Sequence, residues 1–253
     1  MPQKIAFVAS DADVARDAHA RLVQMYESVE PDQADIIVAL GGDGFMLQTL
    51  HATQYLDAPV YGMNRGTVGF LMNAYEEDGL IDRLSAAEEA EINPLSMTAT
   101  DVEGHEFSAL AINEVSLLRA GPQAAKLKIS VDGRERMSEL VSDGVLLATP
   151  AGSTAYNYSA HGPILPIGSA VFAMTALNAY RPRRWRGALI PKASHVDFEV
   201  IDPKKRPVMA DADSRSFANV ARVSIKSETE VVHRLLFDPG HGLDERLIRE
   251  QFV

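Results

Sequence analysis

The N-terminal part of the chain alternates short apolar runs with segments of helical periodicity. Apolar runs of strand length stand at residues 4–9, 36–40 and 59–63. After Ser10 and Asp13, which resemble a helix N-cap pair, apolar residues recur every three or four positions as far as Val29. A second helical segment begins at Phe45, and a third spans residues 76–90. This alternation predicts parallel strands joined by helical crossovers, so we expect residues 1–93 to form an α/β domain with a doubly wound parallel sheet.

Beyond Asn93-Pro94 apolar residues alternate with polar ones, which is the period of a half-buried strand. Strand-like segments follow at residues 95–100, 107–112, 115–118, 126–131, 140–141, 145–149, 196–201, 220–225 and 231–237. Asp132-Gly133, between two of them, is a strong hairpin signal. We therefore predict a β-rich domain of antiparallel sheets over residues 94–237. The tail, 238–253, is expected to return to the first domain through a helix at 244–251.

Composition excludes several classes of protein. The net charge of −11, from 24 basic and 35 acidic residues, opposes binding to nucleic acid or to anionic membranes. It does not exclude a small anionic ligand, which needs only a local cluster of donors. The chain has no cysteine, so disulfides, thiolate zinc sites and cysteine nucleophiles are absent. The seven histidines are scattered, and we predict no metal site built by the protein. With no signal-peptide pattern and no apolar membrane span, we expect a cytoplasmic protein.

A glycine-rich turn, Gly41-Gly42-Asp43-Gly44, follows the apolar run at 36–40 and precedes a helix. Glycines let the backbone approach a ligand closely, and the first turn of a helix offers unpaired N–H groups to phosphate. A carboxylate repels phosphate, so Asp43 makes chemical sense if it accepts a proton from a hydroxyl nucleophile or helps to hold Mg²⁺. The alternative is a tight turn with Asp43 as a helix cap. Neither the Walker A pattern nor the Rossmann glycine pattern is present.

Three other segments carry candidate binding groups. Residues 143–159, which end close to the apolar turn at 162–166, form the densest run of small and hydroxyl-bearing residues in the chain, and they suit a ribose or an amide-bearing ring. The alternative is a loop whose hydroxyls make turn hydrogen bonds. Asn113-Glu114, between apolar strand segments, is either a bulge or a pair that binds the two hydroxyls of a ribose. Arg65 is either a phosphate clamp or a solvated loop arginine.

Taken together, these segments resemble the NAD kinase family. The resemblance rests on residues 41–44, the segment from Gly62 to Leu71, Asn113-Glu114 and the stretch from Asp143 to Pro166, in the family's order and at similar spacing. It implies a kinase that transfers the γ-phosphoryl group of ATP to the 2′-hydroxyl of the adenosine ribose of NAD, giving NADP. Mg²⁺ or another divalent cation would enter with ATP, held largely by its phosphates.

The resemblance also implies roles for particular residues. Asp43 would be the general base, Gly42 and Gly44 would shape the turn that faces phosphate, and Phe70 and Leu71 would lie near the adenine. Asn113 and Glu114 would bind the adenosine portion. The positions that would hold the nicotinamide riboside half are Asp143, Ala151, Thr154, Ala155, Tyr156, Asn157, Tyr158 and Ser159, and Asn178 would also face the ligand. The chain departs from the family at Val141, where many members have Arg, and at residues 210–213, where they often have Asp-Gly.

We therefore expect an ATP-dependent NAD 2′-kinase whose partners are NAD and ATP. Arg181 to Arg186, the most basic stretch, includes the only tryptophan, Trp185, and we interpret it as a subunit contact of a homodimer or homotetramer. The sequence leaves two alternatives open. One is a lipid or small-molecule kinase with the same glycine turn, and the other is a sensor that binds the dinucleotide without turnover. Asp43 argues against the sensor, because a binding protein gains nothing from a carboxylate there.

Overall fold

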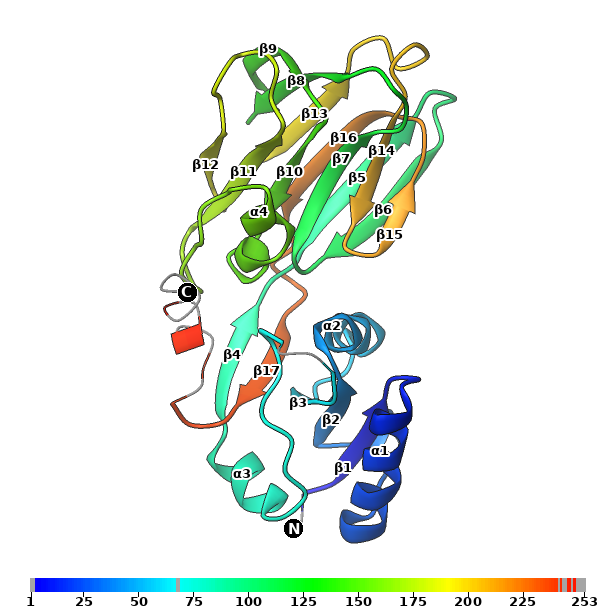
Figure 1. Cartoon of the computed structure of the whole chain (residues 1–253), viewed down its shortest axis with the longest axis vertical. Coiled ribbons are helices and arrows are strands. Elements are labelled where there is room, and N and C mark those ends of the chain that lie inside the picture. Colours follow the sequence, from blue (N-terminus) through cyan, green and yellow to red (C-terminus); the bar gives the residue numbers. More distant parts are fainter. Residues whose placement is uncertain (1–2, 67–68, 241, 243–244, 247, 249–253) are drawn as a thin grey trace. The chain divides into compact units, whose positions relative to one another are not determined.

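The computed structural model describes residues 3–66, 69–240, 242, 245, 246 and 248, and the chain divides into two units (Figure 1). The first unit comprises residues 1–92 and 231–253, and the second comprises residues 93–230. No helix in the described part of the chain is long and apolar enough to cross a membrane.

The first unit is built on a five-stranded sheet in the order β1-β2-β3-β17-β4. Its elements are β1 (Ile5–Ala9), α1 (Asp13–Tyr26), the 3-10 turn η1 (Pro31–Gln33), β2 (Ile36–Gly41), α2 (Asp43–Ala52), β3 (Val60–Asn64), α3 (Leu80–Ala86), β4 (Glu88–Ile92) and β17 (His233–Phe237). Neighbouring strands from β1 to β17 run parallel, and β4 pairs antiparallel with β17 at the edge. The predicted α/β unit with a parallel sheet is confirmed.

Helices cover both faces of this sheet, as the doubly wound expectation requires. Phe7, Val38 and Tyr61 belong to one buried cluster with residues of α1 and α3. Helix α2 covers the opposite face of the sheet. A Cβ added at Gly62 of β3 would lie 3.2 Å from Met46 in that helix. All six residues of β2 are buried, because a strand between two helical layers has no solvent-facing side.

Several local predictions differ from the structure. Residues 76–90 do not form one helix: α3 is short, and the glutamate-rich segment Glu88–Ile92 becomes the edge strand β4. Glu and Ala favour helices, but pairing with β17 overrides that preference, and the glutamates suit an exposed sheet edge. Helix α1 begins at Asp13 with Ala12 as its N-cap and no side-chain cap. Helix α2 begins at Asp43, two residues before the predicted start.

The C-terminal boundary also differs. We expected residues 231–237 in the β-rich domain, but β17 lies between β3 and β4 in the sheet of the first unit. The alternation of a strand sequence does not specify which sheet the strand joins, and here Leu235 and Phe237 are fully buried in the first unit. Most of the helix expected at 244–251 lies outside the described residues. Its described residue Arg246 bonds the carbonyl oxygens of Phe70 and Met72, in agreement with a tail that returns to the first unit.

The second unit consists of two six-stranded antiparallel sheets, in the orders β12-β11-β10-β7-β14-β15 and β6-β5-β16-β13-β8-β9, which confirms the predicted antiparallel architecture. Its strands are β5 (Leu95–Asp101), β6 (Glu106–Ala111), β7 (Glu114–Arg119), β8 (Ala125–Val131), β9 (Arg134–Ser142), β10 (Gly144–Ala148), β11 (Val171–Leu177), β12 (Gly187–Pro191), β13 (Val196–Val200), β14 (Val208–Ala212), β15 (Arg215–Phe217) and β16 (Val220–Ser227). Their inner faces, including those of Leu117 and Phe198, form one apolar core.

The loop that follows β10 packs on the outer face of the sheet β12-β11-β10-β7-β14-β15, away from this apolar core. Leu165 and Ala160 pack on Leu146 of β10 and Ala173 of β11, so these two strands are covered on both faces. The loop contains the 3-10 turn η2 (Ala151–Thr154) and the short helix α4 (Tyr156–Ser159). A layer of small and hydroxyl-bearing residues is thereby fixed on a rigid sheet.

Candidate functional site

The carboxylate of Asp43 is held at the N-terminus of α2 by two backbone hydrogen bonds. Phe70 N–H donates to Oδ2 at 2.6 Å, and Leu71 N–H donates to Oδ1 at 2.9 Å. Gly42 is the N-cap of α2, and no side chain caps this helix, so Asp43 is not the helix cap of the alternative interpretation. The carboxylate therefore has a fixed orientation at the carboxyl end of β2, where parallel sheets bind their ligands.

The glycines around Asp43 have two different structural roles. At Gly42 and Gly44 an added Cβ would have no heavy atom within 4 Å, so the backbone of the turn is open on that side. At Gly69 a Cβ would lie only 2.4 Å from Asp43 Oδ1, so the carboxylate occupies the space of the missing side chain. Phe70 is partly exposed, whereas the Leu71 side chain is buried, and both contact Asp43 through the main chain.

Arg65 joins the glycine turn through its backbone. Its N–H donates to Gly41 O at 2.7 Å. Its guanidinium lies 4.1 Å from the centre of the Tyr75 ring, and Nε donates to Val14 O at 3.3 Å. The role of phosphate clamp stays a prediction, and it would require this guanidinium to leave the tyrosine ring.

In the second unit, Asn113 and Glu114 lie at a corner where the chain passes from one sheet to the other. Strand β6 ends at Ala111, and β7 of the facing sheet begins at Glu114, so the corner replaces the bulge of the alternative interpretation. The carboxylate of Asp213 accepts hydrogen bonds from the N–H groups of Ile112 at 2.7 Å, Asn113 at 2.9 Å and Glu114 at 3.4 Å. Asp213 thus fixes the corner from a position about a hundred residues along the chain.

Glu114 is the most perturbed carboxyl of this cluster. Burial, and then the negative charge of Asp213, raise its pKa to about 7, against a weaker opposing hydrogen bond from the Tyr156 backbone. Its Oε2 is buried and has no hydrogen-bond partner among the described residues. A buried polar atom without a partner is costly, so this oxygen suits a ligand that brings a donor such as a hydroxyl group.

The loop after β10 packs directly on this corner. Thr149 Oγ1 donates to Ile112 O at 2.7 Å and accepts the N–H of Gly152 at 3.0 Å. A Cβ at Gly152 would lie 2.2 Å from Asn113 O, so no larger residue fits between loop and corner. The structure therefore brings the loop predicted to hold the nicotinamide riboside half against Asn113 and Glu114.

The members of that loop differ in where their side chains lie. Asn157 is fully buried: Nδ2 donates to Ser153 O and Pro163 O, at 3.0 and 2.9 Å, and Oδ1 accepts from Thr175 Oγ1 at 2.6 Å. Its side chain therefore holds the loop and is not open to a ligand. Ala151 is buried, Thr154 and Ala155 are intermediate, and Tyr156, Tyr158 and Ser159 are exposed.

Asp143 and Asn178, both predicted to face the ligand, are brought together by the pairing of β10 with β11. Asn178 Nδ2 donates to Asp143 Oδ2 at 2.9 Å, and Arg119 Nε donates to Oδ1 at 2.6 Å. These two hydrogen bonds, that from Asn178 first, lower the pKa of Asp143. Arg119 was not among the predicted residues, because it precedes Asp143 by 24 positions and only strand pairing makes them neighbours.

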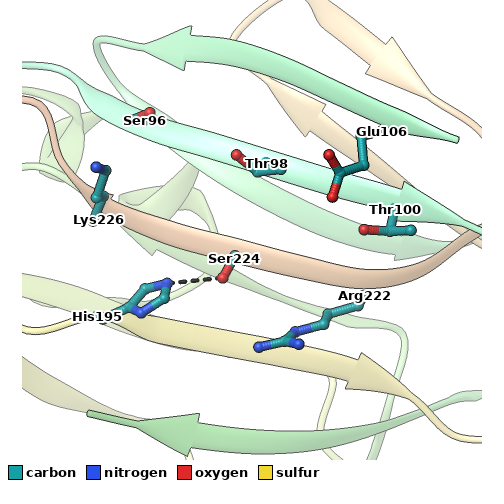
Figure 2. A pocket seen from close by; sticks show the side chains of 8 residues that line it. All are labelled: Ser96, Thr98, Thr100, Glu106, His195, Arg222, Ser224 and Lys226. Carbon is teal, nitrogen blue, oxygen red and sulfur yellow. Dashed lines mark hydrogen bonds between the residues drawn. The ribbon is translucent and has the colours of Figure 1, made fainter. Parts of the chain in front are cut away.

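A hollow of about 370 Å³ lies on the outer face of the sheet that contains β5 and β16. Figure 2 shows its lining of hydroxyl-bearing and charged side chains, in which His195 contacts Ser224. None of the predicted site residues lines this hollow. The described residues contain no group of three or more His, Asp or Glu side chains that could hold a metal ion.

Comparison with known proteins covers both units. Residues 2–91 match the ATP-NAD kinase N-terminal domain, and residues 112–226 match the ATP-NAD kinase C-terminal domain. An NAD kinase of Cereibacter sphaeroides is 68% identical over 252 residues, which is 100% of this chain and 99% of the relative. An NAD kinase of Caulobacter vibrioides is 55% identical over 249 residues, with 98% of this chain and 96% of the relative covered.

Two solved structures share the fold. Yeast NADH kinase in complex with NADH has a TM-score of 0.84 at 21% identity, over 99% of this chain and 87% of that one. An NAD kinase from Archaeoglobus fulgidus in complex with ATP has a TM-score of 0.75 at 24% identity, over 98% of each chain.

Proposed function

Because this chain belongs to the ATP-NAD kinase family, we propose that it transfers the γ-phosphoryl group of ATP to the 2′-hydroxyl of the adenosine ribose of NAD and so produces NADP. The chain is a kinase whose substrates are NAD and ATP. The observation that carries the finer assignment is the Asp43 carboxylate, oriented by two N–H groups beside glycines that leave the turn open.

In this proposal Asp43 takes the proton from the attacking ribose hydroxyl. A carboxylate offers about four acceptor sites on its two oxygens, so one site on each oxygen remains for the hydroxyl after the bonds from Phe70 and Leu71. Those two bonds keep the carboxylate from rotating, which favours a single productive geometry. A positioned general base contributes about 10²–10⁴-fold to the rate, and positioning and charge neutralisation of the phosphoryl group supply the rest.

Backbone N–H groups of the glycine turn and of the first turn of α2 would bind the phosphates of ATP. The first N–H groups of a helix have no partner within the helix, and Gly42 and Gly44 leave the approach to them open. Mg²⁺ enters as part of the substrate Mg-ATP. Both oxygens of Asp43 already accept backbone N–H groups, and the described residues hold no larger carboxylate cluster, so the nucleotide's own phosphates would hold most of the metal's coordination sphere.

The dinucleotide would be bound by the corner and the loop of the second unit. Asn113 and the buried oxygen of Glu114 suit the adenosine hydroxyls. Asp143, aligned by Asn178, and the exposed ring of Tyr156 suit the nicotinamide riboside half. Asn157 is the exception, because its side-chain amide already makes hydrogen bonds within the protein. We therefore propose that Asn157 supports the loop and does not contact the dinucleotide.

A homodimer or homotetramer and a cytoplasmic location are part of the same proposal. Tyr180 and Leu189, which flank the basic stretch from Arg181 to Arg186, are 58% and 56% exposed, which is high for large apolar side chains. Light scattering after size exclusion gives the subunit number, and cell fractionation gives the location.

The direct test is chromatographic detection of NADP after incubation with NAD and Mg-ATP, with diacylglycerol as the competing acceptor and EDTA as a control. We expect NADP from the parent protein and no phosphorylated lipid. Asp43→Asn should bind NAD with nearly unchanged affinity in isothermal titration, while kcat falls by at least about 100-fold. NAD binding without any NADP would favour the sensor, and near-normal turnover of Asp43→Asn would remove Asp43 from the chemistry.

A further inference from the structure

The C-terminal segment contributes one cation to the loop that holds Asp43. Arg246 Nη1 donates to Phe70 O at 3.1 Å and to Met72 O at 2.5 Å. The guanidinium carbon lies 5.1 Å from the centre of the Phe237 ring, at the end of β17. One arginine therefore joins the last strand of the unit to the loop at residues 69–73.

The bond to the Phe70 carbonyl leads directly to Asp43. Phe70 C=O and Leu71 N–H belong to the same peptide group, and that N–H donates to Asp43 Oδ1. The chain of contacts thus runs from guanidinium to carbonyl oxygen, through one peptide group, to the carboxylate. A cation on the carbonyl side of a peptide polarises it and strengthens donation by its N–H, since linked hydrogen bonds reinforce one another.

The other end of the same loop is anchored mainly by bonds that do not involve Arg246. Asn73, which is buried, donates from Nδ2 to Gly62 O at 3.1 Å and to Leu236 O at 2.9 Å, and its Oδ1 accepts the N–H of Asp238 at 3.0 Å. Arg246 Nη2 adds only a longer bond to the same Oδ1, at 3.4 Å. Loss of Arg246 would therefore leave the end of the loop in place. The carbonyls of Phe70 and Met72, which face Arg246, would lose their cation.

We propose that Arg246 is a positioning residue for the phosphoryl-transfer step, which fixes and polarises the peptide between Phe70 and Leu71 so that it holds the Asp43 carboxylate. It acts through Asp43 and does not touch the substrate. The inference rests on the proposed role of Asp43 as the base, and nothing in the sequence signals it, because the two residues are about two hundred positions apart.

The test compares Arg246→Gln, Arg246→Lys and Asp43→Asn in the full-length chain. Arg246→Gln removes the charge, and we expect kcat to fall about 10-fold or more while KM for NAD and for ATP changes less than about twofold. Arg246→Lys keeps a cation, but its single ammonium cannot reproduce the fixed planar placement of Nη1 at the two carbonyls and of Nη2 at Asn73, so it should recover part of the loss. Arg16→Gln, on the exposed face of α1 and paired with Asp13, is the matched control and should keep the parent kinetics.

The double variant Arg246→Gln, Asp43→Asn decides between a relay and a general effect. If Arg246 acts through Asp43, the double variant should be no slower than Asp43→Asn alone. A further drop equal to that of the single Arg246 variant, or an unchanged kcat in Arg246→Gln, would overturn the inference. Should Arg246→Gln fail to fold, the same cycle is run with Arg246→Lys, under the same criteria. An active Asp43→Asn would instead refute the proposed function and leave the cause identifiable.

Discussion

Gly69→Ala perturbs the Asp43 carboxylate without touching its chemistry. Gly69 does not have the left-handed φ that L side chains rarely adopt, so its φ does not exclude alanine there. The new methyl group would lie 2.4 Å from Asp43 Oδ1, 3.0 Å from its Cγ and 3.2 Å from Met72 Cγ. Ordinary contacts of a Cβ begin at 3.4 Å, so the carboxylate or the loop must move by about 1 Å.

The size of the effect follows from that displacement. A misplacement of about 1 Å of a reacting group costs on the order of 100-fold in rate, or about 2.7 kcal/mol of transition-state stabilisation. The loop and helix α2 can absorb part of the overlap, at a cost to folding of about 1–3 kcal/mol for a crowded site. We therefore expect kcat to fall between about 10-fold and 100-fold, while KM for NAD changes little.

The assay is steady-state formation of NADP at a temperature well below the unfolding midpoint of each variant. Gly121→Ala, in the second unit, is the control for adding a methyl group to a glycine: its added methyl group meets no atom closer than 3.7 Å, at Pro207 Cγ. It should keep its kcat within about threefold, as expected for a substitution that meets no close contact. A Gly69→Ala variant with the kcat of Gly121→Ala would refute the view that the position of Asp43 limits turnover.

Two further predictions concern the corner of the second unit. Folding raises the pKa of Glu114 from 4.5 to about 7, so between these pH values the folded state binds more protons than the unfolded state. The folded state therefore loses stability as the pH rises through that window, by up to about 3 kcal/mol. Glu114→Gln should therefore unfold at a higher temperature than the parent at pH 8, and this advantage should shrink towards pH 4.5. Asp213→Ala leaves the N–H groups of Ile112 and Asn113 without an acceptor, so we expect about 1–3 kcal/mol less stability by urea unfolding and a raised KM for NAD.

Both predictions have a discriminating outcome. A Glu114→Gln variant whose stability relative to the parent is the same at pH 4.5 and pH 8 would contradict the raised pKa. For Asp213, the control is Asp213→Asn, which keeps one acceptor oxygen and should lose less stability than Asp213→Ala. Equal losses in the two variants would argue that the corner does not depend on these hydrogen bonds.

The elements that could be predicted from the sequence are those with one strong local signal. The run at 36–40 is apolar throughout because β2 is covered on both faces, and the turn after it could be located by its glycines. Strand β4 could not be predicted from the sequence, because its glutamates and alanine favour a helix. Only the pairing with β17 makes this segment a strand. Strand β11 was missed because it is buried on both sides and shows no alternation.

The same division holds for the site. Asp43, Asn113 and Glu114 could be named from motifs that are continuous in sequence. Asp213 and Arg246 could not be named in this way. Asp213 bonds Glu114 across 99 positions, Arg246 bonds Phe70 across 176 positions, and such contacts follow from the fold alone. Asn157 shows that a motif can also predict a contact that the fold does not allow. Its motif predicts a ligand contact, but in the folded protein its amide already bonds Ser153, Pro163 and Thr175.

The central claim is that the Asp43 carboxylate receives the proton of the adenosine 2′-hydroxyl. A crystal structure of the protein with NAD and a non-hydrolysable ATP analogue measures it directly. We predict a distance of about 2.6–3.2 Å between an Asp43 carboxylate oxygen and the 2′-oxygen, with the hydroxyl facing the γ-phosphate. A bound dinucleotide whose 2′-hydroxyl lies beyond reach of Asp43, and faces another acidic or basic side chain instead, would contradict the account.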